Sequence, residues 1–281
     1  MTYPARGKIQ SEQRRLSGVI LNQQNYILAF CFYLLIMGGC SVTQKIIPRM
    51  VFSSPEEALK YIAAKGPADV TLQALANIQV ANQNGRYPMK LAILLKRPTG
   101  LRVEAIPVLG PPTFFLSIHG QTLKVFLTES RTFYISHATS ENIARYLPLR
   151  MDPEDMLAVL TGTSPLINTQ DRVIKGRQER DHYRIDMEGS AKRLSLWIRL
   201  ADGFFDRLDV YKQQDILYQA FFEEPIVVDG FVIPQKINIL SEGGEKASFS
   251  IRYAEIQFLK TSDPIVFDLN VPPGITPIYL D

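Results

Sequence analysis

The side chains best suited to metal binding or general-base catalysis are three histidines that lie far apart in the chain. His119, His137 and His182 fall in separate turns or strands, without an H-E-x-x-H pair or another spacing typical of a metal site. Histidines in such positions usually face solvent in turns. The sequence therefore predicts no metal site.

Two other segments contain side chains that could take part in hydrolysis. The "GTSP" segment of residues 162–165 lacks the G-x-S-x-G pattern that presents a nucleophilic serine, and it fits a helix stop and turn. The acidic pair Glu223 and Glu224 precedes Pro225, where a solvated turn at a strand end is expected. We expect no catalytic residue and no cofactor, and hence a protein that is not an enzyme.

The thiol of Cys40 is the remaining reactive group, and it ends an apolar segment. Residues 26–37 form a block of twelve residues, whereas a membrane-spanning helix needs about 20. Four basic residues and one acidic residue, Glu12, precede this block. The basic residues are Arg6, Lys8, Arg14 and Arg15. A basic start, an apolar middle and a small-residue end are typical of a secretory signal.

The "MGGC" sequence of residues 37–40 resembles the lipobox of bacterial lipoproteins, although leucine is usual where Met37 stands. The resemblance implies a signal peptide at 1–39 that is removed, and a diacylglycerol and a fatty acid such as palmitate on Cys40. A single acyl chain anchors only marginally, so the two or three chains together would hold the protein on a membrane. Ser41 replaces the aspartate that typically retains lipoproteins at the inner membrane, which implies the periplasmic face of the outer membrane. The alternative is an ordinary buried apolar segment.

The charge of the chain excludes one class of function. The first 39 residues contain four of the 31 basic and one of the 28 acidic residues, which leaves 27 of each in the remainder. A neutral chain without a basic block has no electrostatic reason to bind nucleic acid. Its two cysteines, Cys31 and Cys40, leave none for a disulfide in the remainder, which is long enough for one domain.

Two helices are predicted by the residues at their ends. In the first, "SSPEEALKYIAAKGP", Ser54 is the expected cap, Glu57 completes a capping box and Gly66 ends the helix. In the second, "MDPEDMLAVLTG", Asp152 is the expected cap and Gly162 the stop. A weaker helical turn, "SENIARYL", precedes the second.

Most of the remaining sequence predicts β-strands, which alternate or are β-rich between turn residues. The expected strands lie at 88–98, 101–109, 121–127, 132–136, 193–200, 204–212, 216–222, 231–240 and 246–258. In residues 193–200, Leu194, Leu196 and Ile198 share one face. Short consecutive strands favour an antiparallel meander with one buried face. We predict a mainly β fold: a strongly curved antiparallel sheet, or incomplete β-barrel, covered by two or three helices.

The order of elements resembles the lipoprotein-localisation family of periplasmic carriers and outer-membrane receptors (LolA and LolB). The likeness covers residues 54–281. It lies in "KRPTGLRVEAIPVLGPPTFFLSIHGQTLKVF" (96–126), "DPEDMLAVLTGTSP" (152–165), "FVIPQKINI" (231–239) and "FDLNVPPGITPI" (267–278). The resemblance implies a single half-barrel domain at 54–281, after a lipid-anchored linker at 40–53. It also implies an apolar cavity that binds acyl chains of lipoproteins or lipids, and a LolA-like carrier as a partner.

The resemblance also assigns one residue by position. The receptor displays a leucine at the tip of a protruding loop, needed for lipoprotein insertion, and Leu109 of "PVLGPP" stands at the matching position. Four proline and glycine residues around Leu109 cannot continue a strand ladder, so a loop is expected on physical grounds as well. The alternative is that Leu109 packs inward on a neighbouring strand.

The candidate cavity residues are apolar side chains of the strand faces and of the helix at 152–162. They are Leu91, Ile93, Leu95, Phe114, Leu116, Leu194, Leu196, Ile198, Met156, Leu157 and Leu160. Alternation predicts which residues share a face, but it leaves open whether they enclose a ligand or only a core. The competing function is a scaffold lipoprotein with a filled core, and an apolar void of several hundred cubic ångströms would distinguish the two.

Overall fold

The computed structural model describes residues 49–67, 70–98, 100–147, 149–165, 173–190, 192–242, 246–260 and 263–280. The chain divides into two units, residues 1–47 and 48–281, and the fold below is that of the second. The predicted signal peptide at 1–39, Cys40 and the first part of the predicted linker lie outside the described residues.

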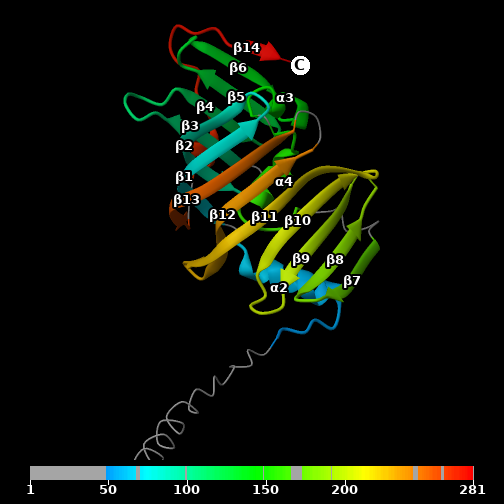
Figure 1. Ribbon diagram of the computed structural model, residues 1–281. Helices are drawn as coiled ribbons and strands as arrows, with labels where there is room; N and C mark the ends of the chain where they lie inside the picture. Colours follow the sequence, from blue (N-terminus) through cyan, green and yellow to red (C-terminus); the bar gives the residue numbers. More distant parts are fainter. Residues whose placement is uncertain are drawn as a thin grey trace, which may run out of the picture. The chain divides into compact units, whose positions relative to one another are not determined.

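One sheet of 14 strands dominates the described residues (Figure 1). Its strands are β1 (Thr71–Asn82), β2 (Gly85–Lys96), β3 (Gly100–Ile106), β4 (Phe114–His119), β5 (Thr122–Leu127), β6 (Thr132–His137), β7 (Val173–Glu179), β8 (His182–Glu188), β9 (Arg193–Arg199), β10 (Phe205–Lys212), β11 (Asp215–Val228), β12 (Phe231–Ser241), β13 (Ala247–Leu259) and β14 (Ile278–Leu280). The predicted fold class is confirmed: the protein is mainly β, with a curved, unclosed antiparallel sheet and few helices.

The sheet joins two meanders side by side. Strands β1 to β6 follow one another in space, as do β7 to β13, and β13 pairs with β1 along most of its length. The short strand β14 adds to the outer side of β6 and is parallel to it. Since β14 and β7 stand at opposite ends of the strand order, the sheet does not close on itself.

The predicted alternation in β9 is confirmed. Leu194, Leu196 and Ile198 are completely buried, because every second side chain of a strand points to the same face. On the opposite face, Trp197 lies between the guanidinium groups of Arg184 and Arg207, at 4.8 and 4.4 Å from the ring. One face of the sheet is therefore apolar and buried, and the other is polar.

The described helices are few: α2 (Pro55–Lys65), α3 (Ser140–Ala144), α4 (Pro153–Leu160) and the 3₁₀ turn η2 (Pro264–Phe267). Helix α2 lies against β7 and buries Ala58 and Ile62. It begins as predicted at Ser54, whose hydroxyl accepts the backbone N–H of Glu57 at 3.2 Å.

The predicted capping box is present and is extended by Ser53. The carboxylate of Glu57 accepts the backbone N–H of Ser53 at 2.7 Å and also the Ser53 hydroxyl. The backbone N–H of Ser54 also bonds to this carboxylate, and together these donors lower the pKa of Glu57, the Ser53 hydroxyl contributing most.

The predicted cap of α4 is only partly correct. Asp152 occupies the capping position, but its side chain accepts no hydrogen bond from the helix. Its carboxylate lies 4.0 Å from the ammonium of Lys192, and burial raises its pKa, with a further contribution from neighbouring Asp155. The predicted stop is confirmed at Gly162, which has φ +66° and where any Cβ would overlap the ring of Pro234.

Residues 49–53, at the end of the predicted linker, contact the sheet. The amide of Met50 donates to the carbonyl of Leu200 at 2.8 Å. The ring of Phe52 is buried against Tyr61 and Tyr183, at 5.7 and 5.3 Å between centroids. The folded unit therefore includes residues before position 54.

The acidic pair predicted to form a solvated turn lies inside β11. Glu223 pairs with Lys236 at 2.7 Å, and Glu224 forms two bonds of 2.6 Å with Arg252. The prediction failed because Pro225 was taken as a strand end, whereas the strand continues to Val228 with Pro225 opposite another proline. Proline has no backbone N–H, so neither member of this opposed pair donates a cross-strand bond to the other.

The carboxyl-terminal segment packs on β3, β4 and β5. The hydroxyl of Ser117 donates to the carbonyl of Phe267, and Lys124 pairs with Asp268 at 2.5 Å. The ring of Phe267 is buried, at 3.1 Å from where a Cβ on Gly100 would lie. Of the helices that the structure describes, none has the length and apolar character needed to cross a membrane.

Candidate functional site

Helix α4 is the central element of the candidate site. Every residue from Asp155 to Leu160 is buried, and the sequence "MLAVL" is apolar on all sides. A helix that is apolar all round belongs in a core, because no face of it can be left in water at low cost. The helix therefore packs within the protein, against the apolar face of the sheet.

Two buried tyrosines hold the ends of α4. At the start of the helix, the hydroxyl of Tyr218 on β11 donates to Oδ2 of Asp155 at 2.9 Å. At its end, the hydroxyl of Tyr253 on β13 donates to the carbonyl of Leu160 at 2.7 Å. Burial raises the pKa of both phenols, that of Tyr218 with a further contribution from the Asp155 carboxylate.

The carboxylate of Asp155 has a second partner, the ammonium of Lys192. A buried carboxylate is costly unless it is paired and hydrogen-bonded, and here both of its oxygens have donors. This polar cluster specifies where the first turn of α4 sits against β11.

An apolar cavity of about 400 Å³ lies between α4 and the sheet. Its wall comes from β1 to β4, the loop before β4, β12, β13, the helix and the segment before the helix. The lining residues are Ile78, Val80, Met89, Leu91, Ile93, Leu101, Val103, Ala105, Thr113, Phe114, Tyr146, Leu147, Leu149, Met151, Met156, Val159, Leu160, Ile239, Phe249 and Ile251. Among the described lining residues, Thr113 and Tyr146 are the two that bring side-chain hydroxyls to this wall. The chemistry it offers is the burial of an apolar group.

The structure divides the predicted cavity residues into two groups. Five of them line the cavity: Leu91, Ile93, Phe114, Met156 and Leu160. The other six are buried in the core outside its lining: Leu95, Leu116, Leu157, Leu194, Leu196 and Ile198. Their role toward a ligand stays a prediction.

Part of the cavity wall was not predicted from the sequence. Tyr146, Leu147, Leu149 and Met151 come from the segment between α3 and α4, and Phe249 and Ile251 come from β13. The alternation in "KASFSIRYAEIQF" was a usable signal for the β13 residues. The segment before α4 has no regular period, so no sequence pattern points to it.

Leu109 lies at the tip of an exposed loop, residues 107–113, between β3 and β4. Its side chain is 89% exposed and that of Val108 is fully exposed. The loop was predicted, and Leu109 does not pack inward. The role of Leu109 in the transfer of lipoproteins stays a prediction.

The three histidines do not converge. His119 and His137 are exposed at strand ends, and His182 on β8 pairs with Asp206 at 2.8 Å. Among the described residues, no group of three histidine, cysteine, aspartate or glutamate side chains could hold a metal ion.

Comparison with solved structures places this architecture among known folds. A LolA superfamily protein from Nitrosomonas europaea matches with a TM-score of 0.55 and 13% identity, over 76% of this chain and 97% of that one. A domain described as that of an outer membrane lipoprotein-sorting protein from Vibrio parahaemolyticus matches with a TM-score of 0.54 and 11% identity, over 75% and 95%. The chain has a LolA-type fold. A DUF1329 family protein from Desulfovibrio piger shares it, with a TM-score of 0.57 and 12% identity over 75% and 95%.

The likeness lies in the fold and not in the sequence. No family model matches the chain, and no curated protein is detectably similar to it in sequence. In the LolA-type fold of this chain, the curved sheet and α4 enclose the apolar cavity, so the cavity is the candidate functional site.

Proposed function

We propose that this protein binds acyl chains of lipoproteins or lipids in the cavity beneath α4, and that it acts in their localisation to the outer membrane. The cavity carries this proposal. Its volume of about 400 Å³ falls within the roughly 300–1,000 Å³ typical of small-molecule sites. An acyl chain needs no polar anchor there, because burial contributes about 25 cal/mol per Å² of apolar surface.

Binding without catalysis is part of the proposal. The described residues bring no nucleophile and base together at the cavity wall, where Thr113 and Tyr146 are the side chains with hydroxyl groups. The protein would take up its cargo and release it with no bond made or broken.

We propose an envelope location, with the protein on the periplasmic face of the outer membrane through acylated Cys40. A Cys40→Ala variant should remain uncleaved and unacylated, because the thiol is the group that is acylated and the leader is cut at the peptide bond before the modified cysteine. Mass spectrometry of the purified protein measures both. Processing of this variant to the wild-type size would contradict lipidation at Cys40.

The first test is native mass spectrometry with lipid extraction on protein that begins at Ser41 and is purified from a bacterial host. Acyl-chain binding predicts a stoichiometric lipid or acylated peptide bound to the protein. A reproducibly empty protein would contradict it.

A variant that fills the cavity supplies the control. Val159 is buried on α4 and lines the cavity, so a Val159→Phe substitution places a ring in the void. We expect the bound lipid to be lost while the urea midpoint changes little, because the void accepts the added volume. The buried residue Leu157, on the same helix but outside the cavity lining, gives the comparison: Leu157→Met should keep the lipid.

A scaffold is the second candidate, and the sheet edges favour it. Among the described strands, β7 pairs with β8 alone, and its side chains are exposed or half-buried. A partner could add a strand there. Cross-linking in the envelope that captures a protein through β7, together with an empty cavity, would favour the scaffold over lipid binding.

A further inference from the structure

The inward-facing side chains of β2 become exposed toward one end of the strand. Leu95 is 1% exposed and Leu91 is 6% exposed, but Met89 is 39% and Tyr87 is 46% exposed. These residues alternate along one strand and so face the same side of the sheet. Solvent therefore reaches the inner face of the sheet at Met89 and Tyr87.

The exposure begins where the hydrogen-bonded partner of β2 ends. Strand β3 pairs with β2 only from Lys96 to Lys90, whereas β1 pairs with β2 along its whole length to Gly85. Residues 85–89 thus have a neighbour on one side only. Pro88 lies in this free stretch and brings no backbone N–H to it.

The loop at 107–113 is held on the side away from β2. The hydroxyl and the amide of Thr128, in the turn between β5 and β6, donate to the carbonyl of Thr113 at 2.9 and 3.2 Å. The amide of Thr113 donates back to Ala105 at 3.2 Å. These bonds fix the end of the loop next to β5, and a break in the sheet remains beside β2.

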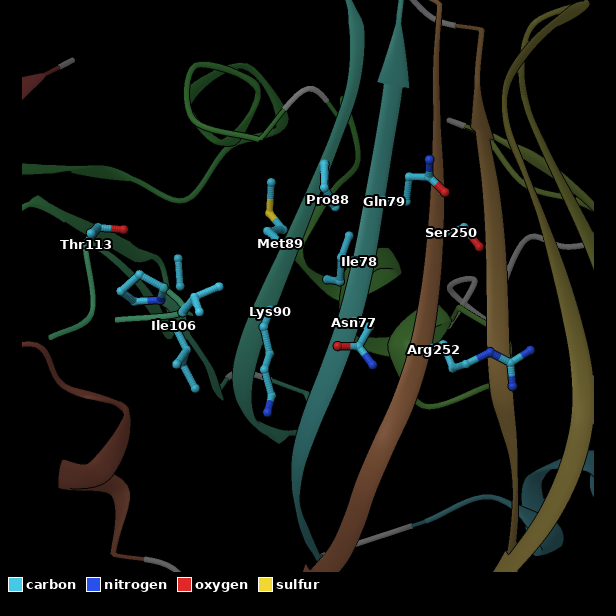
Figure 2. Close-up of a pocket in the computed structure, with 13 residues that line it drawn as sticks. Asn77, Ile78, Gln79, Pro88, Met89, Lys90, Ile106, Thr113, Ser250 and Arg252 are labelled. Atoms are coloured by element: carbon cyan, nitrogen blue, oxygen red, sulfur yellow. The ribbon is translucent and has the colours of Figure 1, made fainter. Parts of the chain in front are cut away.

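A hollow of about 690 Å³ lies over the outer face of β13, β1 and β2 and extends to this break. Figure 2 shows Pro88 and Met89 on β2, with Ile106 and Thr113 across from them. The hollow shares four lining residues with the cavity beneath α4: Ile78, Met89, Ala105 and Thr113. Of these, Met89 has the long, unbranched side chain that can change rotamer most freely.

We propose that acyl chains pass into the cavity sideways, through the break between β2 residues 85–89 and the loop at 107–113, with Met89 as the side chain that moves aside. This inference rests on the proposed function and specifies its route. An apolar chain with a polar head suits a lateral opening, because the head stays in water at the outer face while the chain enters.

The route can be tested by closing it. In the full chain with Cys31→Ser and Cys40→Ser, cysteines replace Pro88 and Val108, which line the hollow from β2 and from the loop. A reducible bifunctional thiol reagent then joins the two. The probe is cis-parinaric acid, a fatty acid that fluoresces when it is held in an apolar site, followed by stopped flow.

A second cysteine pair controls for the reagent. Gln79 and Ser250 also line the hollow, but they are register partners on the adjacent strands β1 and β13. A link between them joins strands that are already hydrogen-bonded and leaves the break open.

Closing the break should slow both uptake and release of the probe by about tenfold or more, as for other gated sites. Because both rates fall together, the equilibrium Kd should stay unchanged. Reductant should cleave the link and restore the rates. The link at Gln79 and Ser250 should leave the rates unchanged. Unchanged uptake through the closed break, or equal slowing by both links, would overturn the lateral route alone. Failure of the unlinked protein to bind the probe would overturn the proposed function as well.

Discussion

Leu109 and Val108 place two apolar side chains in water at the tip of a loop. Burying apolar surface is favourable, so exposed side chains of this kind often mark a contact with another protein or with a membrane. Three prolines in the loop, Pro107, Pro111 and Pro112, restrict its backbone and so reduce the entropy that it loses on contact. We therefore propose that the tip of this loop, at Val108 and Leu109, inserts into the membrane.

Leu109→Glu should abolish delivery of lipoproteins to the membrane and leave folding intact. A charge at the tip opposes insertion into lipid, and the native side chain makes no buried contact that would be lost. The measurement is transfer of an acylated lipoprotein from a LolA-like carrier to vesicles.

Val227→Glu supplies the matched control. Val227 also has an exposed apolar side chain (71% exposed), but it lies near the turn between β11 and β12. It should leave delivery unchanged. Delivery that survives in Leu109→Glu would remove the role inferred for this leucine.

At the scale of elements, α4 is fastened at both ends by phenol hydroxyls from two different strands. Tyr218 and Tyr253 fix its first and last turns, while Gly162 ends it against Pro234. Helix α4, which covers the cavity, is therefore held in place by hydrogen bonds as well as by apolar contacts.

Replacing both tyrosines by phenylalanine should loosen α4. Each lost hydrogen bond contributes about 1 kcal/mol, so amide exchange in residues 153–163 should accelerate by about fivefold or more. Hydrogen exchange with mass spectrometry measures this directly. Tyr211→Phe is the comparison, because its hydroxyl bonds to Asp209 on the polar face at 3.2 Å. Equal acceleration in Tyr211→Phe would show that α4 is not selectively held by the buried pair.

At the scale of the whole molecule, the two buried phenols couple stability to alkaline pH. Burial raises the pKa of Tyr218 and Tyr253 in the folded protein, whereas the unfolded chain titrates near the ordinary value of about 10. As pH rises above about 10, the unfolded state releases protons that the native state retains, so the free energy of unfolding falls.

Each of these tyrosines adds a slope of up to about 1.4 kcal/mol per pH unit above pH 10. Urea unfolding at a series of pH values from about 8 to 11 measures the slope. The Tyr218→Phe, Tyr253→Phe double variant should show a shallower decline than the wild type, although it is less stable at neutral pH. An identical slope in the two proteins would contradict the shifted pKa values.

Much of the fold could be predicted from local pattern. Alternation marked the buried face of β9, and Ser54 and Gly162 marked a helix start and a helix stop. Strands β8 and β14 were not predicted, and neither were β1 and β7. Strand β1 is rich in alanine, asparagine and glutamine, which are poor strand formers, and β7 contains Gly176 and charged residues at a sheet edge. Both are stabilised by their neighbours in the sheet.

The sequence by itself determined the class of the protein: a mainly β chain with one apolar face, few helices and a loop at Leu109. Periods of two and 3.6 residues and the residues at helix ends are local properties, so they can be read without the fold. Only the tertiary structure decided that β13 pairs with β1, that α4 leaves a void of about 400 Å³, and that the sheet breaks beside Met89. A void or a break depends on how far apart distant segments are held, and no local pattern encodes that distance.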